Sequence, residues 1–142
     1  MYSCTTVGAG IEIVVDTSVL IAVIANKPEK PSLIQSTVGA TLTAPSFVHW
    51  EIGNAFSAML RRKQITFDQA QQALLAYQTI PVRFLDVDLD QALRLAVQLN
   101  IYTYDAYLIA CAITQRAPLL TLDSGLRSAA QQVGVKLVEI SQ

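Results

Sequence analysis

Short apolar runs rich in β-branched residues alternate along the chain with longer stretches in which apolar residues recur at helical spacing. The short runs predict strands at residues 11–15, 40–43, 82–85, 118–122 and 135–138. The longer stretches predict helices at residues 19–25, 31–38, 46–62, 66–77, 89–99, 104–115 and 124–132. Strands that alternate with helices favour one parallel sheet of about five strands, covered by helices on both faces.

The chain length leaves room for one domain. Its 142 residues fall within the roughly 100–200 residues of a usual domain, and a chain of this size builds a core without disulfides or a structural metal. Residues 1–10 have no basic start and no apolar centre, so they do not resemble a signal peptide. We therefore expect a loose extension over residues 1–10 and a single domain over residues 11–142.

The composition excludes several classes of protein. Hydrophobic residues make up 52% and charged residues 15% of the chain, against about 25% charged in an average domain, which excludes a disordered, coiled-coil or low-complexity chain. The most apolar window, residues 11–25, contains Glu12 and Asp16 and is shorter than the roughly 20 residues that span a bilayer. We expect no membrane segment. Because Cys4 and Cys111 form no metal motif, we expect a reducing, cytoplasmic setting.

The net charge is close to zero. Ten Lys and Arg residues against eleven Asp and Glu residues give −1, so no overall positive field attracts nucleic acid. The basic run Arg61-Arg62-Lys63 lies at the predicted end of a long helix, where the helix dipole favours positive charge. This run has two interpretations, a solvated helix end or a contact for a phosphate backbone.

Four carboxylates stand among apolar residues, where an unpaired charge is costly: Asp16, Glu51, Asp105 and Asp123. Asp16 and Asp123 directly follow predicted strands, so we expect them at the edge of the sheet where α/β folds bind ligands. Glu51 and Asp105 lie in the first turns of helices that begin at or near the same edge. The other acids, Glu12 among them, fit helix caps or solvated charges and need no function.

Carboxylates that converge in this way repel one another, which raises their pKa values unless a cation lies between them. A site of carboxylate oxygens without cysteine or a well-placed histidine suits Mg²⁺ or Mn²⁺ better than zinc. We therefore predict one or two hard divalent ions at these acids. Each acid also has a structural alternative, because Asp16 and Asp123 could cap helices, and Glu51 and Asp105 could pair with arginines.

Four segments carry a resemblance to a known family. They are Val14-Val15-Asp16-Thr17-Ser18-Val19-Leu20-Ile21-Ala22, Glu51-Ile52-Gly53-Asn54-Ala55, Tyr104-Asp105-Ala106 and Leu119-Leu120-Thr121-Leu122-Asp123. Together they resemble the PIN-domain ribonucleases, and in particular the VapC-type toxins. The resemblance runs from about Ile11 to Val138, and the ordered set is far more specific than any one segment. The chain departs from the family pattern in residues 1–10 and at Gly53, which lies inside a predicted helix.

The resemblance implies an α/β/α sandwich, Mg²⁺- or Mn²⁺-dependent hydrolysis of RNA phosphodiester bonds, a homodimer, and inhibition by a small antitoxin protein. It implies that Asp16, Asp105 and Asp123 hold the metal. It also implies that Glu51 helps to bind the metal, directly or through water, while Asn54 lies one turn beyond it on the same helix face.

Two hydroxyl side chains, Ser18 and Thr121, match positions that orient the acids in the family that the chain resembles. The chemistry that follows is in-line attack by water on an RNA phosphate, in which a hard cation offsets the charge that develops on the phosphoryl oxygens. The resemblance implies products with a 5′-phosphate and a 3′-hydroxyl.

One other function stays open at this point, and a second is nearly excluded. A PIN-like domain without turnover would act as a binding module for RNA or for a partner protein. Asp86-Val87-Asp88 matches the opening motif of the haloacid dehalogenase-like phosphatases, but too few residues follow for the rest of that fold.

Aromatic residues close to the acids are compatible with packing as well as with function. Tyr102, Tyr104 and Tyr107 could stack on nucleic-acid bases or pack at a helix start. His49 and Trp50 directly precede Glu51. We interpret His49 as a surface or hydrogen-bonded residue rather than a ligand, and Trp50 as a residue of the core or of dimer packing.

Overall fold

A computed structural model describes residues 10–140 of the chain. Its strands are β1 (Glu12–Val15), β2 (Thr41–Pro45), β3 (Val82–Leu85) and β4 (Leu119–Leu120). Its helices are α2 (Thr17–Ile24), α3 (Lys30–Thr37), α4 (Phe47–Arg61), α5 (Phe67–Gln78), α6 (Leu89–Leu99), α7 (Thr103–Gln115) and α8 (Ser124–Gln132). Residues 1–9 lie outside the described residues, so the loose extension stays a prediction. No helix in the described part is long and apolar enough to cross a membrane.

Helix ends follow the local signals in the sequence. Thr66 Oγ1 accepts a hydrogen bond from the Gln69 backbone N–H at 3.1 Å, and Gln69 Oε1 accepts one from the Thr66 N–H at 2.9 Å. These two bonds form the capping box that the sequence predicts at the start of α5. Asp88 caps α6, which ends at Asn100 in a left-handed conformation with φ of 54°.

The sheet is parallel and has the strand order β3-β2-β1-β4. The α/β class is therefore confirmed, but within residues 10–140 the sheet has four strands where the sequence predicts about five. The predicted strand 135–138 forms a single bridge, between Leu137 and Leu119. The reason is the length of β4, because a strand of two residues leaves little edge for a further partner.

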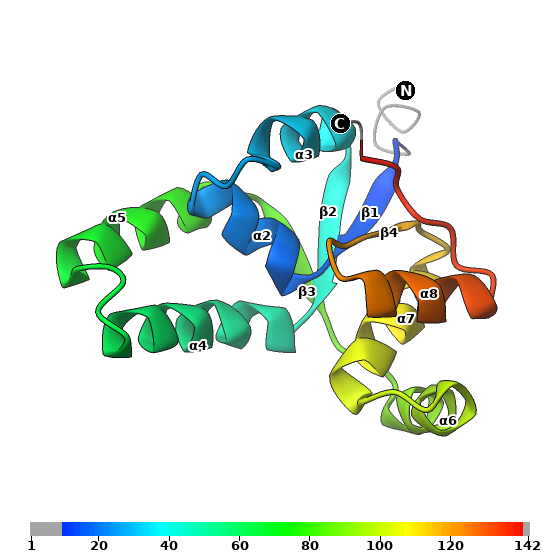
Figure 1. The fold of residues 1–142 in the computed structure, drawn as a ribbon. Helices are drawn as coiled ribbons and strands as arrows, with labels where there is room; N and C mark the ends of the chain where they lie inside the picture. The colour runs from blue at the N-terminus through cyan, green and yellow to red at the C-terminus, as the bar shows by residue number, and fades with distance from the viewer. Residues whose placement is uncertain (1–9, 141–142) are drawn as a thin grey trace.

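The helices form two layers, one on each side of the sheet. Figure 1 shows α2, α3, α4 and α5 on one side and α6, α7 and α8 on the other. The helices that follow the neighbouring strands β1 and β4 therefore leave in opposite directions. Such a change of direction opens a crevice at the carboxyl ends of the two strands, where α/β proteins bind ligands.

Strands β1 and β4 lie in the core between these layers. Val14, Val15, Leu119 and Leu120 are fully buried, as expected for strands covered on both faces. Cys111 of α7 is also buried, and this burial raises the pKa of its thiol to about 11. The thiol therefore stays protonated at neutral pH and serves as a small core side chain.

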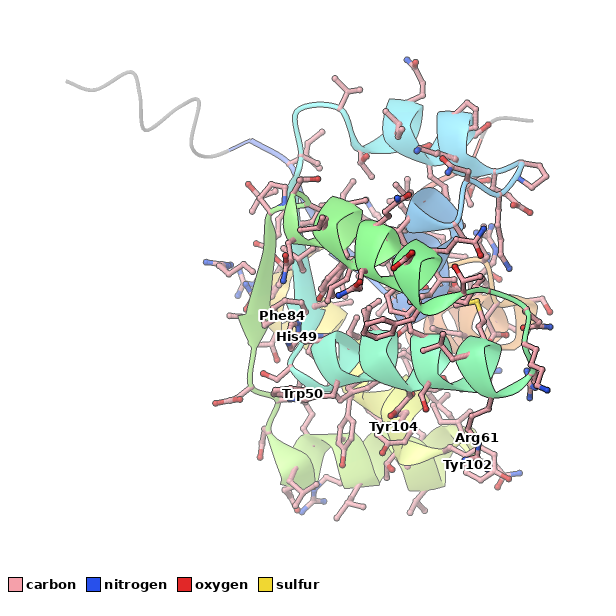
Figure 2. The ribbon with its side chains drawn as sticks, turned by 90° about the vertical axis from the view of Figure 1, so that its left-hand side faces the viewer. His49, Trp50, Arg61, Phe84, Tyr102 and Tyr104 are labelled. Carbon is pink, nitrogen blue, oxygen red and sulfur yellow. The ribbon has the colours of Figure 1, made fainter. Side chains whose placement is uncertain are left out.

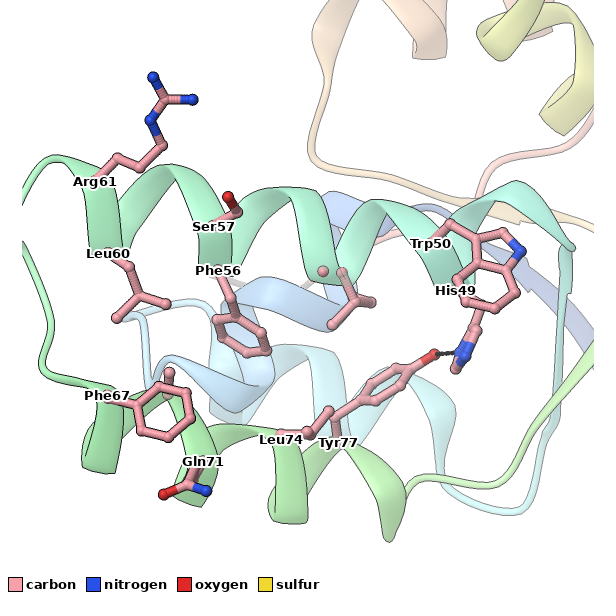
Figure 3. Close-up of a pocket in the computed structure, with 13 residues that line it drawn as sticks. His49, Trp50, Phe56, Ser57, Leu60, Arg61, Phe67, Gln71, Leu74 and Tyr77 are labelled. Atoms are coloured by element: carbon pink, nitrogen blue, oxygen red, sulfur yellow. Dashed lines mark hydrogen bonds between the residues drawn. The ribbon is translucent and has the colours of Figure 1, made fainter.

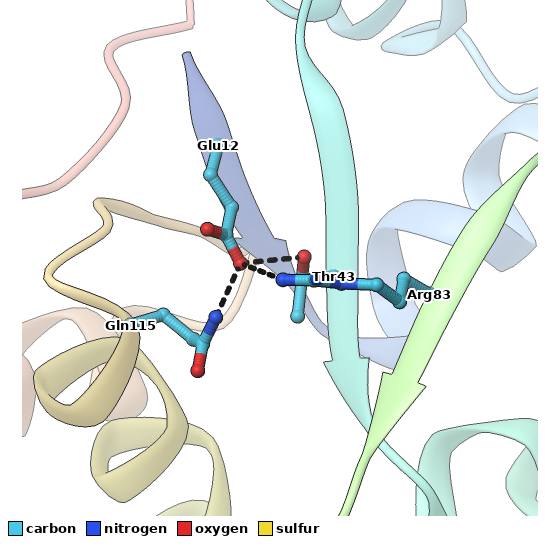
Figure 4. A network of polar contacts seen from close by, with 4 residues as sticks. All are labelled: Glu12, Thr43, Arg83 and Gln115. Carbon is cyan, nitrogen blue, oxygen red and sulfur yellow. Dashed lines mark hydrogen bonds and ion pairs between the residues drawn. The ribbon is translucent and has the colours of Figure 1, made fainter. Parts of the chain in front are cut away.

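Glu12 is not the solvated charge that the sequence suggests. Its Oε2 accepts hydrogen bonds from Thr43 Oγ1 at 2.8 Å and from Gln115 Nε2 at 2.9 Å (Figure 4). Arg83 Nη2 adds an ion pair at 3.1 Å. Burial raises the pKa of this carboxyl group, but the hydrogen bonds and the Arg83 charge outweigh burial and hold it below the usual value. One carboxylate oxygen thus ties β2, β3 and α7 to the first residue of β1.

We expect Glu12→Gln to lower the free energy of unfolding by about 1 kcal/mol at neutral pH, because a charged acceptor is replaced by a neutral one. Since the folded-state pKa of Glu12 is lowered, its contribution is present above the unfolded-state pKa and is lost as the pH falls through the folded-state pKa. Urea denaturation at neutral and acidic pH measures both effects. Glu29→Gln is the matched control, because Glu29 is exposed at the N-cap of α3 and makes no side-chain capping hydrogen bond. Equal stability of Glu12→Gln and wild type at neutral pH would show that the charge of Glu12 does not stabilise the fold.

Candidate active site

Asp16 lies at the point where β1 ends and α2 begins. It is the N-cap of α2, and only 6% of its surface is exposed. Its Oδ1 accepts hydrogen bonds from Ser18 Oγ at 2.6 Å and from the Val19 N–H at 3.3 Å, and its Oδ2 accepts one from Thr121 Oγ1. Both carboxylate oxygens are therefore held by donors in a fixed orientation.

The two hydroxyl groups also hold the loop after β4. Ser18 Oγ accepts a hydrogen bond from the Leu122 N–H at 3.3 Å, and Thr121 Oγ1 accepts one from the Asp123 N–H at 3.0 Å. Each hydroxyl thus donates to Asp16 and accepts from the backbone that leads to α8. These hydrogen bonds connect residues more than 100 positions apart in the sequence and fix the two strand ends relative to each other.

Asp123 is the N-cap of α8. Its Oδ1 accepts hydrogen bonds from the Gly125 N–H at 2.9 Å and from the Leu126 N–H at 3.4 Å. A β-carbon at Gly125 would lie 3.4 Å from that oxygen, which is ordinary contact. The capping alternative is therefore correct for Asp16 and Asp123, but capping occupies one oxygen of Asp123 and leaves Oδ2 without a hydrogen bond to any residue of 10–140.

Asp105 lies in the first turn of α7 and completes a group of three carboxylates. Burial raises its pKa, and the charges of Asp123 and Asp16 raise it further. Burial also raises the pKa of Asp16, assisted by the Asp123 charge, although the hydrogen bonds to Asp16 act in the opposite direction. Three aspartates from three distant parts of the chain are therefore close enough to act on one another electrostatically.

Glu51 and Asn54 both lie on α4, Glu51 half-buried and Asn54 exposed. Neither makes a side-chain hydrogen bond within the described residues. The structure shows no contact that joins Glu51 to the three aspartates, so its part in the site stays a prediction. The pairing alternative is wrong for Glu51 and Asp105, because the arginines that form ion pairs within residues 10–140 bind Glu12, Asp90 and Glu139.

The donor set fits a hard divalent cation in chemistry and in charge. Its free donors are carboxylate oxygens, which Mg²⁺ and Mn²⁺ prefer, and the described residues supply no cation to offset the three charges. The side chains do not form a closed cage, since no three His, Cys, Asp or Glu residues of the described ranges stand close enough to hold one ion. An open site is compatible with Mg²⁺, which keeps several waters and binds through one or two carboxylates.

We expect Mg²⁺ or Mn²⁺ to raise the melting temperature by about 5–10 °C at a concentration 100 times the dissociation constant. The folded-state pKa values of Asp16 and Asp105 are raised, so without metal their contribution to stability is present at low pH and is lost as the pH rises through those values. A cation favours the charged forms, and its effect should shrink as the acids protonate. Thermal melts with and without metal, from about pH 4 to pH 8, measure this. If Asp105→Asn leaves the metal-induced rise in melting temperature unchanged, the metal does not bind at Asp105.

The aromatic residues near the acids divide into packed and exposed groups. The Tyr107 ring packs against Phe47 at 5.7 Å between centroids. His49 is exposed at the surface, and its Nδ1 lies 2.8 Å from the hydroxyl oxygen of the buried Tyr77, so its ring is hydrogen-bonded within the chain. Trp50 and Tyr102 are mostly exposed, which packing within this chain does not explain.

An apolar groove between α4 and α5 was not predicted from the sequence. It has a volume of about 540 Å³ and is lined by Phe56, Leu60, Phe67 and Leu74, with the His49–Tyr77 hydrogen bond at one end (Figure 3). The sequence signal for it was weak, because the lining residues belong to two separate helices. The groove lies on the face of α4 turned toward α5, whereas Glu51 occupies a different face of that helix.

A parallel α/β sheet with carboxylates at its switch point defines the class of α/β proteins that bind a ligand at this edge of the sheet. The sequence identifies the family within that class. The chain matches the family model of the PIN domain over residues 13–132. The protein therefore belongs to the PIN domain family. A search of the curated proteins finds no match.

Solved structures of similar fold include members of toxin–antitoxin systems. PAE2754 of Pyrobaculum aerophilum is 25% identical, with a TM-score of 0.69 over 90% of this chain and 84% of its own. VapBC2 of Rickettsia felis, bound to a DNA fragment from its promoter, is 16% identical with a TM-score of 0.66, over 91% and 98%. VapC20 of Mycobacterium tuberculosis, a toxin that cleaves the sarcin-ricin loop, is 18% identical with a TM-score of 0.58, over 82% and 94%.

Proposed function

We propose that this protein is an endoribonuclease that requires Mg²⁺ or Mn²⁺, hydrolyses RNA phosphodiester bonds and serves as the toxin of a toxin–antitoxin pair. One observation carries the proposal. The Asp16 carboxylate is buried and held by Ser18 and Thr121. Burial and the Asp123 charge raise the pKa of Asp16, and burial together with the Asp123 and Asp16 charges raises the pKa of Asp105. A protein that needed only stability would not collect uncompensated carboxylates at this edge.

Each side chain has a distinct role in this proposal. Asp16, fixed through both oxygens, sets the position of the site. Asp105 and the free oxygen of Asp123 are the remaining donors, and Glu51 is proposed as a further acid, bound directly or through water. One or two divalent ions, when bound, supply Lewis-acid activation of water and neutralise charge on the phosphate.

The supporting residues act through the acids. Ser18 and Thr121 donate to Asp16, which keeps its oxygens oriented and favours the ionised form that binds a cation. Asn54 is exposed on α4, one turn beyond Glu51, and we propose that it contacts the substrate rather than the metal. The family membership and the fold shared with VapC20 support nuclease activity.

A protein antitoxin and a second copy of the chain are the partners in this proposal. The α4–α5 groove is apolar and open, which suits the apolar face of a partner helix. On α6, Leu89, Leu93 and Val97 are exposed at intervals of four residues and form an apolar stripe, which suits a homodimer contact. We place the protein in the cytoplasm, where such a pair would act on RNA.

Incubation of the purified protein with mixed RNA, with and without Mg²⁺, tests the activity directly. We expect fragments with 5′-phosphates to accumulate only when Mg²⁺ or Mn²⁺ is present, and chelation to stop the reaction. The alternative is a PIN domain that binds RNA or a partner without turnover. Metal-dependent binding without fragments would favour that alternative and would exclude the nuclease.

A further inference from the structure

A small cavity lies at the carboxyl ends of β2 and β3, on the edge of the sheet that also carries the acids. It has a volume of about 180 Å³. Ser46 and Asp86, which directly follow the two strands, supply its polar side chains, and Phe47 and Tyr107 supply aromatic rings. The other lining residues are apolar. Asp86 belongs to the motif Asp86-Val87-Asp88, for which the proposed catalytic site has no use.

The register of the sheet places this cavity beside Asp16. Val14 of β1 lies opposite Thr43 of β2, so Asp16, two residues later, is level with Pro45. Pro45 in turn lies opposite Leu85, the last residue of β3. Neighbouring strands are about 4.8 Å apart, so the cavity lies roughly 5–10 Å from Asp16, one or two strands along the edge. A base next to a phosphate bound at the acids can reach a cavity at this distance.

Helix α7 also connects the cavity with the acids. Tyr107, which lines the cavity, follows Asp105 by two residues. The ring of Phe47 lies 5.7 Å from that of Tyr107 and 4.8 Å from that of Tyr104. In the view of Figure 2, Tyr104 lies below α4 and Phe84 of β3 lies above it. The three packed rings therefore extend from the cavity to the residue that directly precedes Asp105.

The polar side chains of the cavity have hydrogen-bonding capacity to spare. Ser46 Oγ lies 3.2 Å from Leu85 O and 3.4 Å from Asp86 Oδ1, and its single proton serves one of them. Asp86 is exposed and forms no ion pair within residues 10–140. Its Oδ2 accepts no hydrogen bond from that part of the chain. The cavity therefore offers carboxylate and hydroxyl oxygens as acceptors, and no cationic side chain lines it.

The size of the cavity and its acceptors indicate the ligand. Pockets for drug-sized molecules have volumes of about 300–1,000 Å³, so this smaller cavity suits a single nucleobase. Unstacked bases are recognised through hydrogen bonds to their Watson–Crick edge and through aromatic or apolar contacts. On that edge guanine has two neighbouring N–H donors, at N1 and N2, whereas adenine, cytosine and uracil each have one donor group. A carboxylate accepts two parallel N–H bonds, as it does from arginine.

We propose that this cavity binds a guanine base of the RNA next to the scissile phosphate, with the Asp86 carboxylate accepting hydrogen bonds from guanine N1–H and N2–H. Ser46 orients the carboxylate. Asp86 is thereby a specificity-determining residue, and cleavage occurs at a fixed distance from a guanosine. This inference rests on the proposed nuclease function and adds the base that the site selects.

Binding of short labelled RNA tests the base site, with the Asp16→Asn protein used throughout so that the probes stay intact. One probe is an oligouridylate with a single central guanosine. The other carries inosine at that position, which differs from guanosine only in lacking the N2 amino group. We expect the guanosine strand to bind about 5- to 50-fold more tightly. When Asp86→Ala is added, the two strands should bind equally, because both carboxylate oxygens are gone.

Two further variants accompany this measurement. Ser46→Ala should reduce the preference for guanosine and keep the fold, because Ser46 makes no side-chain capping hydrogen bond at the start of α4. Asp68→Ala is the matched control, since Asp68 is an exposed acid on α5, and it should keep the preference.

Equal binding of the two strands, or a preference that survives Asp86→Ala, would overturn the base site. An arginine-rich peptide that binds only when Asp86 is present, while the two RNA strands bind equally, would assign the cavity to a partner protein instead.

Mapping of cleavage sites on mixed RNA separates this inference from the function on which it rests. Metal-dependent cuts by the wild-type protein at a fixed distance from guanosine, with the preference lost in Asp86→Ala, support both. Cuts without any base preference overturn the base site and leave the nuclease. Guanosine-selective binding by a protein that never cleaves RNA supports the base site and overturns the nuclease.

Discussion

Asp105→Asn and Asp16→Asn should each lower the initial rate of Mg²⁺-dependent RNA cleavage by at least about 100-fold, because a lost cation ligand removes several kcal/mol of transition-state stabilisation. Asparagine keeps the size of the side chain and removes its charge. Asp105→Asn is the simpler variant to interpret, because Asp105 makes no side-chain hydrogen bond with another described residue that the change would disturb. Initial rates on mixed RNA measure the effect.

Asp68→Asn is the matched control for these variants. Asp68 is exposed in the first turn of α5, away from the sheet edge, so its loss should leave the rate unchanged. Loss of folding would not explain an inactive Asp105→Asn protein, since removal of a charge with a raised pKa should stabilise the metal-free protein at neutral pH. Wild-type rates in both active-site variants would exclude the proposed function.

Thr121→Val should lower both stability and activity, because it removes the hydroxyl that donates to the buried Asp16 carboxylate. We expect a loss of about 1.5–3 kcal/mol in the free energy of unfolding at neutral pH, the range for hydrogen bonds to charged groups. Cleavage should fall by about 10- to 100-fold, as for partners that orient metal ligands. The pKa of Asp16 should rise further, so the loss of stability should shrink at low pH, where the carboxyl group is neutral.

Thr121→Ser keeps the hydroxyl and should restore most of both properties. Thr114→Val is the second control, because its hydroxyl makes only an exposed contact with Gln91 at 3.4 Å. Urea denaturation and initial cleavage rates are compared across the three variants. A Thr121→Val protein as stable and as active as wild type would show that the hydrogen bond does not position Asp16.

Much of the fold follows from local pattern. The predicted limits of α6 at residues 89–99 and of α8 at 124–132 agree with the structure, because caps and apolar periodicity act within a few residues. The predicted strand 135–138 failed for a non-local reason, since its extent depends on the length of β4. Strand β2 continues through Pro45, where the sequence predicts an end at residue 43, because Pro45 pairs with Leu85 of β3.

The candidate site likewise has a part that could be predicted from the sequence and a part that could not. Asp16 and Asp123 could be placed at a sheet edge from the sequence, because each follows a strand and caps a helix. The hydrogen bonds through which Ser18 and Thr121 join the two strand ends could not be predicted from the spacing of residues in the sequence, because their partners lie more than 100 residues away. Glu12 failed as a prediction for the same reason, since its donors belong to β2, β3 and α7.

By itself the sequence determined the alternation of strands and helices, the helix caps and the identity of the four acids that stand among apolar residues. The tertiary structure decided that β1 and β4 are neighbours, that Asp16, Asp105 and Asp123 act on one another, and that a groove lies between α4 and α5. The physical reason is the distance along the chain over which each interaction acts. Helix caps and periodicity depend on neighbours along the chain, whereas strand order and convergence of charges depend on the packing of the whole domain.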